Sequence, residues 1–211
     1  GDRVPTVVPG SPELDLTYDM LERGDSIGKG GNADVYRATA SVNGTVHAVA
    51  LKEPRLEETI GLEVVEEFVR EAETWAKLDD HDHIVDVVDW DTEPLPWIAM
   101  EHMDSGDLSE RSDAPLSERF WVAETVTDAV LHAHRRGVAH LDLKPENILF
   151  RHTEEGWDIP KVADWGLARM LLNHSKSVQG MTPRYAAPEQ FDDDTAVGQP
   201  ADIYQLGAVF Y

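Results

Sequence analysis

The sequence predicts an α+β protein whose first half is rich in strands and whose second half is rich in helices. Between Tyr18 and Leu51, short β-like runs alternate with glycine turns, and Asn43-Gly44 is a typical hairpin signal. From Leu116 onward, apolar residues recur with the period of a helix. We therefore expect two lobes with a cleft between them.

The individual elements follow from local patterns. Residues 1–17, with Pro5, Pro9 and Pro12, are expected to form an extended arm. A helical stripe runs from Glu63 to Leu78, and further strands are expected over 83–90 and 97–102. The helix after Leu116 is expected to end at Gly137. Its expected buried face consists of Phe120, Ala123, Val126, Val130 and Ala133.

Composition excludes several classes of protein. The chain has 211 residues, of which 41% are hydrophobic, and it contains six tryptophans, so it is not disordered. Its 41 acidic and 18 basic residues give a net charge of −23. This charge repels nucleic acid and anionic membranes. It is explained by a solvated acidic face or by adaptation to high salt. The spread of Asp and Glu over the whole chain favours a halophilic source.

The chain has no cysteine, which excludes disulfides and thiolate metal sites and fits a cytoplasmic protein. No run of eighteen apolar residues occurs, so we expect no membrane insertion in this segment. The first residue is Gly1 rather than Met, and we expect the chain to be part of a longer polypeptide.

The most informative stretch is the run His140-Leu141-Asp142-Leu143-Lys144-Pro145-Glu146-Asn147. It places a carboxylate, an ammonium group and a carboxamide on one short loop. A phosphoryl transferase needs an acceptor for the substrate hydroxyl proton, a cation beside the moving phosphoryl group and an oxygen ligand for a metal.

Further motifs precede and follow this run in a meaningful order. A glycine-rich loop spans residues 28–35, and an apolar run ends at Lys52, ahead of a helix that carries Glu71. Downstream come Asp164-Trp165-Gly166 and the segment from Thr182 to Glu189. From about Tyr18 to Tyr211, the chain resembles a eukaryotic-type Ser/Thr protein kinase domain.

This resemblance implies a bilobal protein-kinase-like fold. Residues 18–102 would form a small, nucleotide-binding lobe, an antiparallel sheet with one helix. Residues 103–211 would form a larger, mainly helical catalytic lobe that is cut short at its end. The implied function is transfer of the γ-phosphoryl group of Mg-ATP to Ser or Thr hydroxyls of protein substrates.

The resemblance also assigns roles to single residues. Asp142 would be the base, Lys144 would neutralise the γ-phosphate, and Lys52, paired with Glu71, would hold the α- and β-phosphates. The implied Mg²⁺ ligands, which would also suit Mn²⁺, are Asn147 and Asp164. The implied nucleotide contacts are Ile27, Gly28, Gly30, Val35, Ala50, Lys52, Met100, Glu101, Met103, Asp107 and Leu149.

Supporting residues are implied as well. The hydroxyl of Thr182 would bond Asp142 and Lys144, and Asp202 would anchor the backbone of the catalytic loop. His140 would be a packing residue. The remaining expectation concerns Trp165, which would stack on Trp75, Val87 and His140.

Two positions depart from the family pattern: Ala33 stands for the third glycine and Leu141 for an arginine. Leu141 cannot pair with a phosphate on Ser175 or Ser177, so we expect such a phosphate to have little effect. Both departures are compatible with a pseudokinase that serves as a scaffold. A small-molecule kinase of related fold is a second alternative, which the Thr182–Glu189 segment disfavours.

Overall fold

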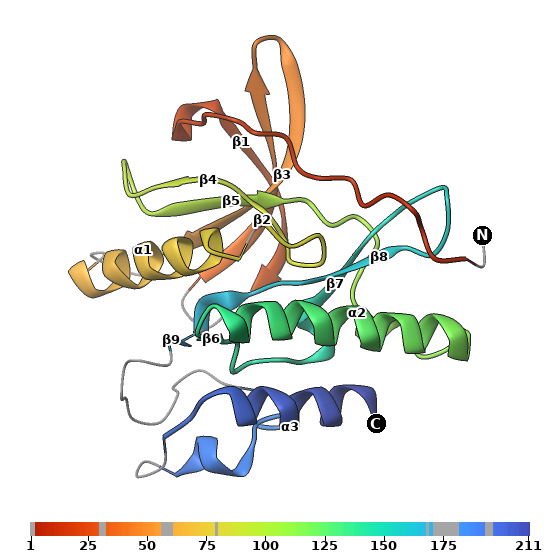
Figure 1. Ribbon diagram of the computed structural model, residues 1–211. Coiled ribbons are helices and arrows are strands. Elements are labelled where there is room, and N and C mark those ends of the chain that lie inside the picture. Colours follow the sequence, from red (N-terminus) through yellow and green to blue (C-terminus); the bar gives the residue numbers. More distant parts are fainter. Residues whose placement is uncertain are drawn as a thin grey trace. The chain divides into compact units, whose positions relative to one another are not determined.

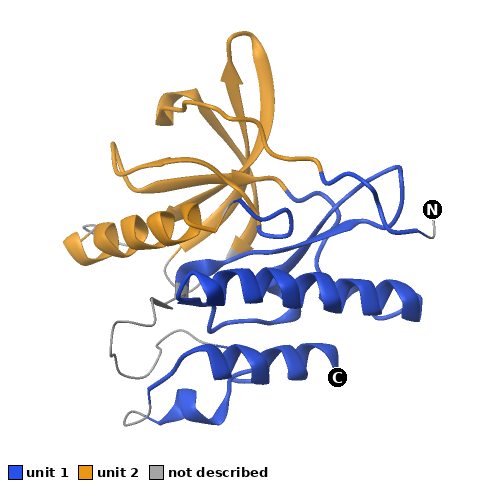
Figure 2. Cartoon of the chain, viewed as in Figure 1, with its two compact units in different colours: residues 1–8, 80–84, 103–211 blue, residues 9–79, 85–102 orange. Residues whose placement is uncertain are grey.

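The computed structural model describes residues 3–29, 33–55, 61–78, 80–167, 169–170, 182–192 and 196–211. The chain divides into two compact units (Figure 2). Residues 9–79 and 85–102 form the first, here called the sheet unit. Residues 1–8, 80–84 and 103–211 form the second, here called the helical unit. Among the described helices, none has the length and apolar character needed to cross a bilayer.

A five-stranded antiparallel sheet is the frame of the sheet unit (Figure 1). Its strand order is β1-β2-β3-β5-β4. The strands are β1 (Leu21–Lys29), β2 (Ala33–Val42), β3 (Thr45–Pro54), β4 (Val87–Asp91) and β5 (Trp97–Glu101). Leu51, Trp97 and Ala99 are buried on this sheet, together with Leu16 from the segment before β1.

The hairpin signal Asn43-Gly44 is confirmed. Val42 of β2 pairs with Thr45 of β3, so these two residues alone form the connection. Their φ angles are 50° and 79°. Positive φ at both positions matches the twist of the flanking strands, and Asn-Gly adopts it at low cost. This turn fixes the register of β3 and therefore the place of Lys52.

Helix α1 (Leu62–Ala76) packs against β4 and β5 (Figure 1). Phe68, Ala72 and Trp75 of the expected stripe are buried. The indole N–H of Trp75 donates to the Val85 carbonyl at 2.6 Å. The stripe was therefore only partly correct, since Ala76, which was also assigned to it, is exposed. Glu71 on the same helix meets the lysine of the sheet unit, as described below.

Among its described residues, the helical unit contains two longer helices and two small strand pairs, β6 with β9 and β7 with β8 (Figure 1). The elements are α2 (Leu116–Arg135), β6 (Val138–Ala139), β7 (Ile148–Arg151), β8 (Ile159–Val162), β9 (Arg169–Met170) and α3 (Gln199–Phe210). Short 3-10 turns complete the described elements: Tyr18–Met20 of the sheet unit, and Leu108–Glu110, Pro145–Asn147, Trp165–Leu167 and Pro188–Phe191 of the helical unit.

The expected buried face of α2 was partly wrong. Phe120 is 67% exposed, whereas Val122 and Ala129 are buried beside the expected Val126, Val130 and Ala133. Phe120 lies two residues before Val122, which places it about 200° around the helix from the buried stripe. Apolar residues occur on both sides of the start of α2, so periodicity alone did not identify the inner one.

One other expectation needs correction. The strand expected over 83–90 begins only at Val87, because Ile84 forms a parallel bridge with Val162 of the helical unit instead. Most of residues 3–17 are exposed, but two points of this arm are held in place. Leu16 is buried in the sheet unit, and the Arg3 carbonyl accepts a hydrogen bond from the N–H of Trp157 at 2.8 Å.

Candidate active site

The sheet unit brings several predicted nucleotide contacts onto neighbouring register positions. Gly28 of β1 pairs with Val35 of β2, and Val35 pairs with Lys52 of β3. Directly paired residues of an antiparallel sheet point to the same face. Ala50 lies two residues before Lys52, on that face, and pairs with Met100 of β5. Five residues far apart in sequence therefore share one face of the sheet.

Lys52 is held by Glu71 of α1, as expected. The Lys52 Nζ lies 2.5 Å from Glu71 Oε1, and the two side chains are 14% and 9% exposed. An ion pair that is mostly removed from water is screened little by salt. The pair fixes the ammonium group at the edge of the shared face, where it can neutralise phosphate oxygens.

Three remaining predictions in this unit have different outcomes. Ile27 is 51% exposed, next to Gly28. The backbone N–H of Glu101 donates to the Asp86 carbonyl at 2.9 Å, so an adenine contact cannot come from that N–H. Gly30 lies outside the described residues, as do Ser175 and Ser177.

The catalytic loop of the helical unit holds Asp142 in a defined orientation. Asp142 Oδ1 accepts from the Thr182 N–H at 3.1 Å. Its Oδ2 lies 3.6 Å from Lys144 Nζ and accepts from Asn147 Nδ2 at 3.4 Å. The carboxylate is largely buried. Three donors around one carboxylate fix its plane, which is what a base that must face a substrate hydroxyl requires.

Asn147 links this carboxylate to the predicted metal-binding aspartate. Asn147 Nδ2 donates to the Asp142 carbonyl at 2.8 Å, and the Asn147 carbonyl accepts from the Ala163 N–H at 2.8 Å. Ala163 immediately precedes Asp164, whose φ of 60° turns the chain after β8. The backbone thus ties the two proposed ligands together.

These residues fit a magnesium ion. A carboxamide oxygen and a carboxylate are hard ligands, and Mg²⁺ in phosphoryl-transfer sites is held by one or two protein groups together with phosphates and water. Within the described ranges there is no group of three His, Cys, Asp or Glu residues that could hold a metal by itself.

Thr182 contacts both expected partners, but it uses its hydroxyl for only one of them. Its hydroxyl accepts from Lys144 Nζ at 2.7 Å, as expected. Asp142, however, is bonded by the backbone N–H of Thr182 and not by its hydroxyl. The hydroxyl of Thr182 therefore positions the lysine, while its main chain positions the base.

Asp202 anchors the catalytic loop, which confirms the expectation for its geometry. It is fully buried and accepts from the backbone N–H groups of His140 at 2.8 Å and Leu141 at 2.7 Å. The ring of His134 on α2, which the sequence reading had not assigned to the site, also lies 2.7 Å from Asp202 Oδ2 through Nε2. Three donors around one buried carboxylate compensate the cost of removing its charge from water.

His140 is a packing residue, also as expected. Its Nδ1 accepts from the Asp142 N–H at 3.1 Å, and its Nε2 lies 2.9 Å from the Ala163 carbonyl. Because the carbonyl only accepts, Nε2 carries the proton and the ring is the neutral tautomer. The ring meets Trp165 edge-on at 4.5 Å between centroids. This contact between Trp165 and His140 is the part of the expected stacking column that lies within the helical unit.

Asp107 and Leu149 face each other in an isolated antiparallel bridge. The Asp107 carboxylate accepts from the N–H of Ser109 at 2.8 Å and from its hydroxyl, and so caps the turn Leu108–Glu110. Met103 begins the last part of the helical unit. The nucleotide contacts of these three residues stay predictions.

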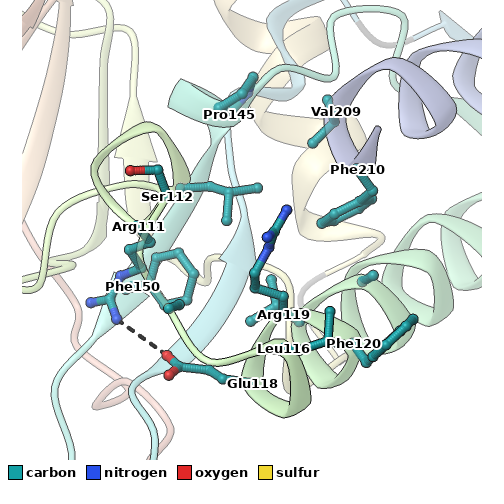
Figure 3. A pocket seen from close by; sticks show the side chains of 14 residues that line it. Arg111, Ser112, Leu116, Glu118, Arg119, Phe120, Pro145, Phe150, Val209 and Phe210 are labelled. Atoms are coloured by element: carbon teal, nitrogen blue, oxygen red, sulfur yellow. Dashed lines mark ion pairs between the residues drawn. The ribbon is translucent and has the colours of Figure 1, made fainter.

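A separate cavity of about 330 Å³ lies elsewhere in the helical unit (Figure 3). It is mainly apolar and is lined by the start of α2, by the end of α3 and by Pro145 and Phe150. Arg111 and Glu118 form an ion pair at its rim at 3.7 Å. Asp142, Lys144, Asn147 and Asp164 are not among its lining residues, so this cavity is not the catalytic site.

A family model for the protein kinase domain matches residues 21–211. The chain belongs to the protein kinase family. The kinase domain is 35% identical over 193 residues to the serine/threonine-protein kinase Pkn1 of Myxococcus xanthus. It is 36% identical over 214 residues to the probable serine/threonine-protein kinase CE0033 of Corynebacterium efficiens. It is 34% identical over 194 residues to the serine/threonine-protein kinase PrkC of Bacillus subtilis.

These matches cover 88%, 92% and 88% of the chain, respectively. They cover only 27%, 30% and 28% of the relatives, so the chain spans less than a third of their length. The α+β fold expected from the sequence agrees with the family. Protein kinases in general use ATP and Mg²⁺, and the similarity to Ser/Thr kinases indicates a transferase.

Proposed function

We propose that this chain is the catalytic domain of a Ser/Thr protein kinase that transfers the γ-phosphoryl group of Mg-ATP to hydroxyl groups of protein substrates. The observation that carries the proposal is the arrangement of Asp142, Lys144 and Thr182. The carboxylate, the ammonium group and the downstream segment are bonded to one another at 3.6 Å or less. A phosphoryl acceptor placed there would meet a base and a cation together.

The residues of the chain divide the chemistry among them. Lys52, held by Glu71, binds the α- and β-phosphates. Asp142 orients the attacking Ser or Thr hydroxyl and accepts its proton, while Lys144 neutralises charge on the phosphoryl group in transfer. Asn147 and Asp164 would hold Mg²⁺, which would supply positive charge to neutralise the phosphates. Because the transfer step needs little covalent help, positioning and charge account for most of the catalysis.

The net charge of −23 supports a protein partner over nucleic acid. The proposal includes a cytoplasmic location, where ATP is available, and a high-salt source, which rests on the charge alone. A pseudokinase and a small-molecule kinase are the outcomes against which the proposal is tested. Absence of turnover would indicate the first, and transfer only to small molecules the second.

The test uses the full-length protein with labelled ATP, Mg²⁺ and a generic protein substrate at low and high KCl. Asp142→Asn and Asp164→Asn should each lower phosphoryl transfer by about 10²–10⁴-fold, the range for loss of a general base or of charge stabilisation. Only Asp164→Asn should strongly weaken binding of Mg-ATP, because Asp142 contacts the acceptor and not the metal. Asp113→Asn, at an exposed position outside the site, is the matched control. Normal turnover of the Asp142 variant would refute the assigned base.

A further inference from the structure

Two buried glutamines, Gln190 and Gln205, lie next to the catalytic loop, and the chemistry described above gives them no role. Gln190 belongs to the 3-10 turn Pro188–Phe191 and Gln205 to α3. Their exposed fractions are 0% and 1%. Gln205 Nε2 donates to Gln190 Oε1 at 2.9 Å, so the two amides are joined directly.

Both amides bind the backbone before Asp142, and Gln205 also binds the backbone after it. The Leu141 carbonyl accepts from Gln190 Nε2 at 2.9 Å and from Gln205 Nε2 at 3.1 Å. Gln205 Oε1 accepts from the Leu143 N–H at 2.9 Å. A carbonyl can only accept and an N–H can only donate, so these partners fix which way the Gln205 amide points. The residues before and after the base are therefore held by one side chain.

Gln190 extends the same network to the segment downstream of Thr182. Its Oε1 accepts from the Ala187 N–H at 2.9 Å. Ala187 precedes Pro188-Glu189, the end of the segment in which the resemblance places substrate docking. The catalytic loop and this segment are thus connected through two neutral amides.

Leu141 is the residue that most needs such support. Its φ of 70° lies in the left-handed region, which is strained for a residue other than glycine. Its N–H is bonded to Asp202 and its carbonyl to both glutamines. Its side chain packs in an apolar cluster with Ala139, Ala187 and Ala201. The conformation persists because every part of the residue is held, and loss of the amide bonds would let the main chain next to Asp142 relax.

We propose that Gln190 and Gln205 are a pair of positioning residues that orient Asp142 by holding Leu141 and Leu143, and that couple this loop to the Ala187 segment without using a charged group. The inference rests on the proposed kinase function, since the pair acts through the base. Because amide bonds carry no net charge, the coupling forms without phosphate on the chain. Buried in the protein, it also changes little with salt.

The test compares Gln190→Met, Gln205→Met and the double variant in the full-length protein. Methionine fills a similar volume but cannot make the hydrogen bonds. Gln199→Met is the matched control, because Gln199 lies on the same helix and donates to the His134 carbonyl at 2.9 Å, away from Leu141. Each single variant should lower kcat at least about tenfold and change KM for ATP by less than about twofold, while the control keeps its kcat within about twofold.

Two further results separate positioning from a general loss of structure. If the glutamines act as one unit, the double variant should lose no more kcat than the more impaired single variant. Backbone hydrogen exchange of residues 141–143 and 187, measured without nucleotide, should accelerate in the Gln190 and Gln205 variants and not in the control. Unchanged exchange, or a loss of kcat equal to that of the control, would overturn the inference. Absence of phosphoryl transfer by the wild-type protein would refute the kinase function instead, and the exchange measurement would still decide the role of the pair.

Discussion

Glu71 in the sheet unit and Asp202 in the helical unit are both carboxylates that hold another part of the site, but they do so by different means. Glu71 binds the end of a long side chain, the Nζ of Lys52, and 9% of its own side chain is exposed. Asp202 is fully buried and binds the main chain at His140 and Leu141. A rotamer change is enough to open the first contact, whereas the second opens only if the catalytic loop moves. The sheet unit therefore carries an adjustable contact and the helical unit a fixed one.

The largest expected effect follows from the fixed contact. Asp202→Ala leaves two buried N–H groups and the His134 ring without their acceptor, and should lower the free energy of unfolding by about 3–5 kcal/mol. Denaturant unfolding measures this loss. Asp202→Asn keeps one acceptor oxygen and should lose less. A loss below about 1 kcal/mol in the alanine variant would contradict the view that Asp202 fixes the loop.

Glu71→Gln should affect activity more than stability, the opposite of what is expected for Asp202→Ala. The free energy of unfolding should fall by less than about 2 kcal/mol, because the amide oxygen of glutamine can still accept a hydrogen bond from Lys52 Nζ. The kcat/KM for ATP should fall by at least about tenfold, because Lys52 loses the partner that positions it. Glu73→Gln is the control, since Glu73 is exposed on the same helix. A variant that lost stability and kept its kcat/KM would show that the pair is structural.

A pH-dependent contact extends the comparison to residues 80–84. The rings of His81 and His132 lie 4.7 Å apart. His132 Nε2 lies 2.9 Å from Asp80 Oδ1, and its Nδ1 accepts from Arg136 at 3.1 Å. His81 binds Asp128 through Nε2 and accepts the His83 N–H through Nδ1.

The pKa of His132 is lowered by burial and by the nearby Arg136 and His81, while Asp80 raises it by a smaller amount. Burial likewise lowers the pKa of His83, and His81 and Lys161 lower it further. The hydrogen bond to the Pro160 carbonyl, 2.8 Å from Nδ1, and the charge of Asp82 oppose this shift.

Because these pKa values lie below that of an unfolded histidine, the unfolded chain takes up protons first as the pH falls. The free energy of unfolding should therefore be highest above the unfolded pKa of about 6.5 and decrease below it, by about 1 kcal/mol or less down to pH 5.5. His132→Gln should flatten this dependence, whereas His47→Gln, on the sheet unit, should leave it intact. Urea unfolding at several pH values checks the sign, and a rise in stability on acidification would contradict it.

The smallest expected effect is that of salt. Raising KCl from 0.1 M to 2 M shortens the Debye length from about 10 Å to 3 Å or less and screens the excess of acidic charge. The melting temperature should rise by about 1–2 °C, equivalent to about 0.5 kcal/mol, or by more. The loss caused by Asp202→Ala should be the same at both salt concentrations, because that contact is fully buried. A melting temperature that stays flat or falls would argue against a high-salt source.

The site was predictable where its residues stand on regular elements or in short motifs. Lys52 and Glu71 lie on a strand and a helix with clear patterns, and their contact was expected before the structure. Asp202 was found because it lies in a recognisable helix motif. Gln190 and Gln205 were missed. Both are neutral amides far from Leu141 in sequence, and a glutamine is not typical of any single structural role. The local signal was Pro188 at the first position of a turn and Gln190 at the third, which predicts a bond back to the Ala187 N–H.

Other errors came from packing that periodicity does not record. Phe120 was assigned to the core because it continues an apolar spacing, but the buried stripe of α2 runs through Val122 instead. The hydroxyl of Thr182 was expected to bond both Asp142 and Lys144. The hydroxyl and the backbone N–H of Thr182 point in different directions. The hydroxyl bonds Lys144, and the N–H bonds Asp142.

The first described residues of the chain belong to the unit that is completed last. Arg3 is bonded to Trp157 and Glu155, and a Cβ on Gly156 would collide with the Arg3 carbonyl. During synthesis, the ribosome releases the whole sheet unit, which ends at residue 102, well before it reaches Gly156. Since domains fold as their last residues emerge, the sheet unit can form first, while residues 3–8 wait for their partners. Residues 3–8 therefore reach their final contacts only after the segment around Gly156 has been made, at a later step of folding than the sheet unit.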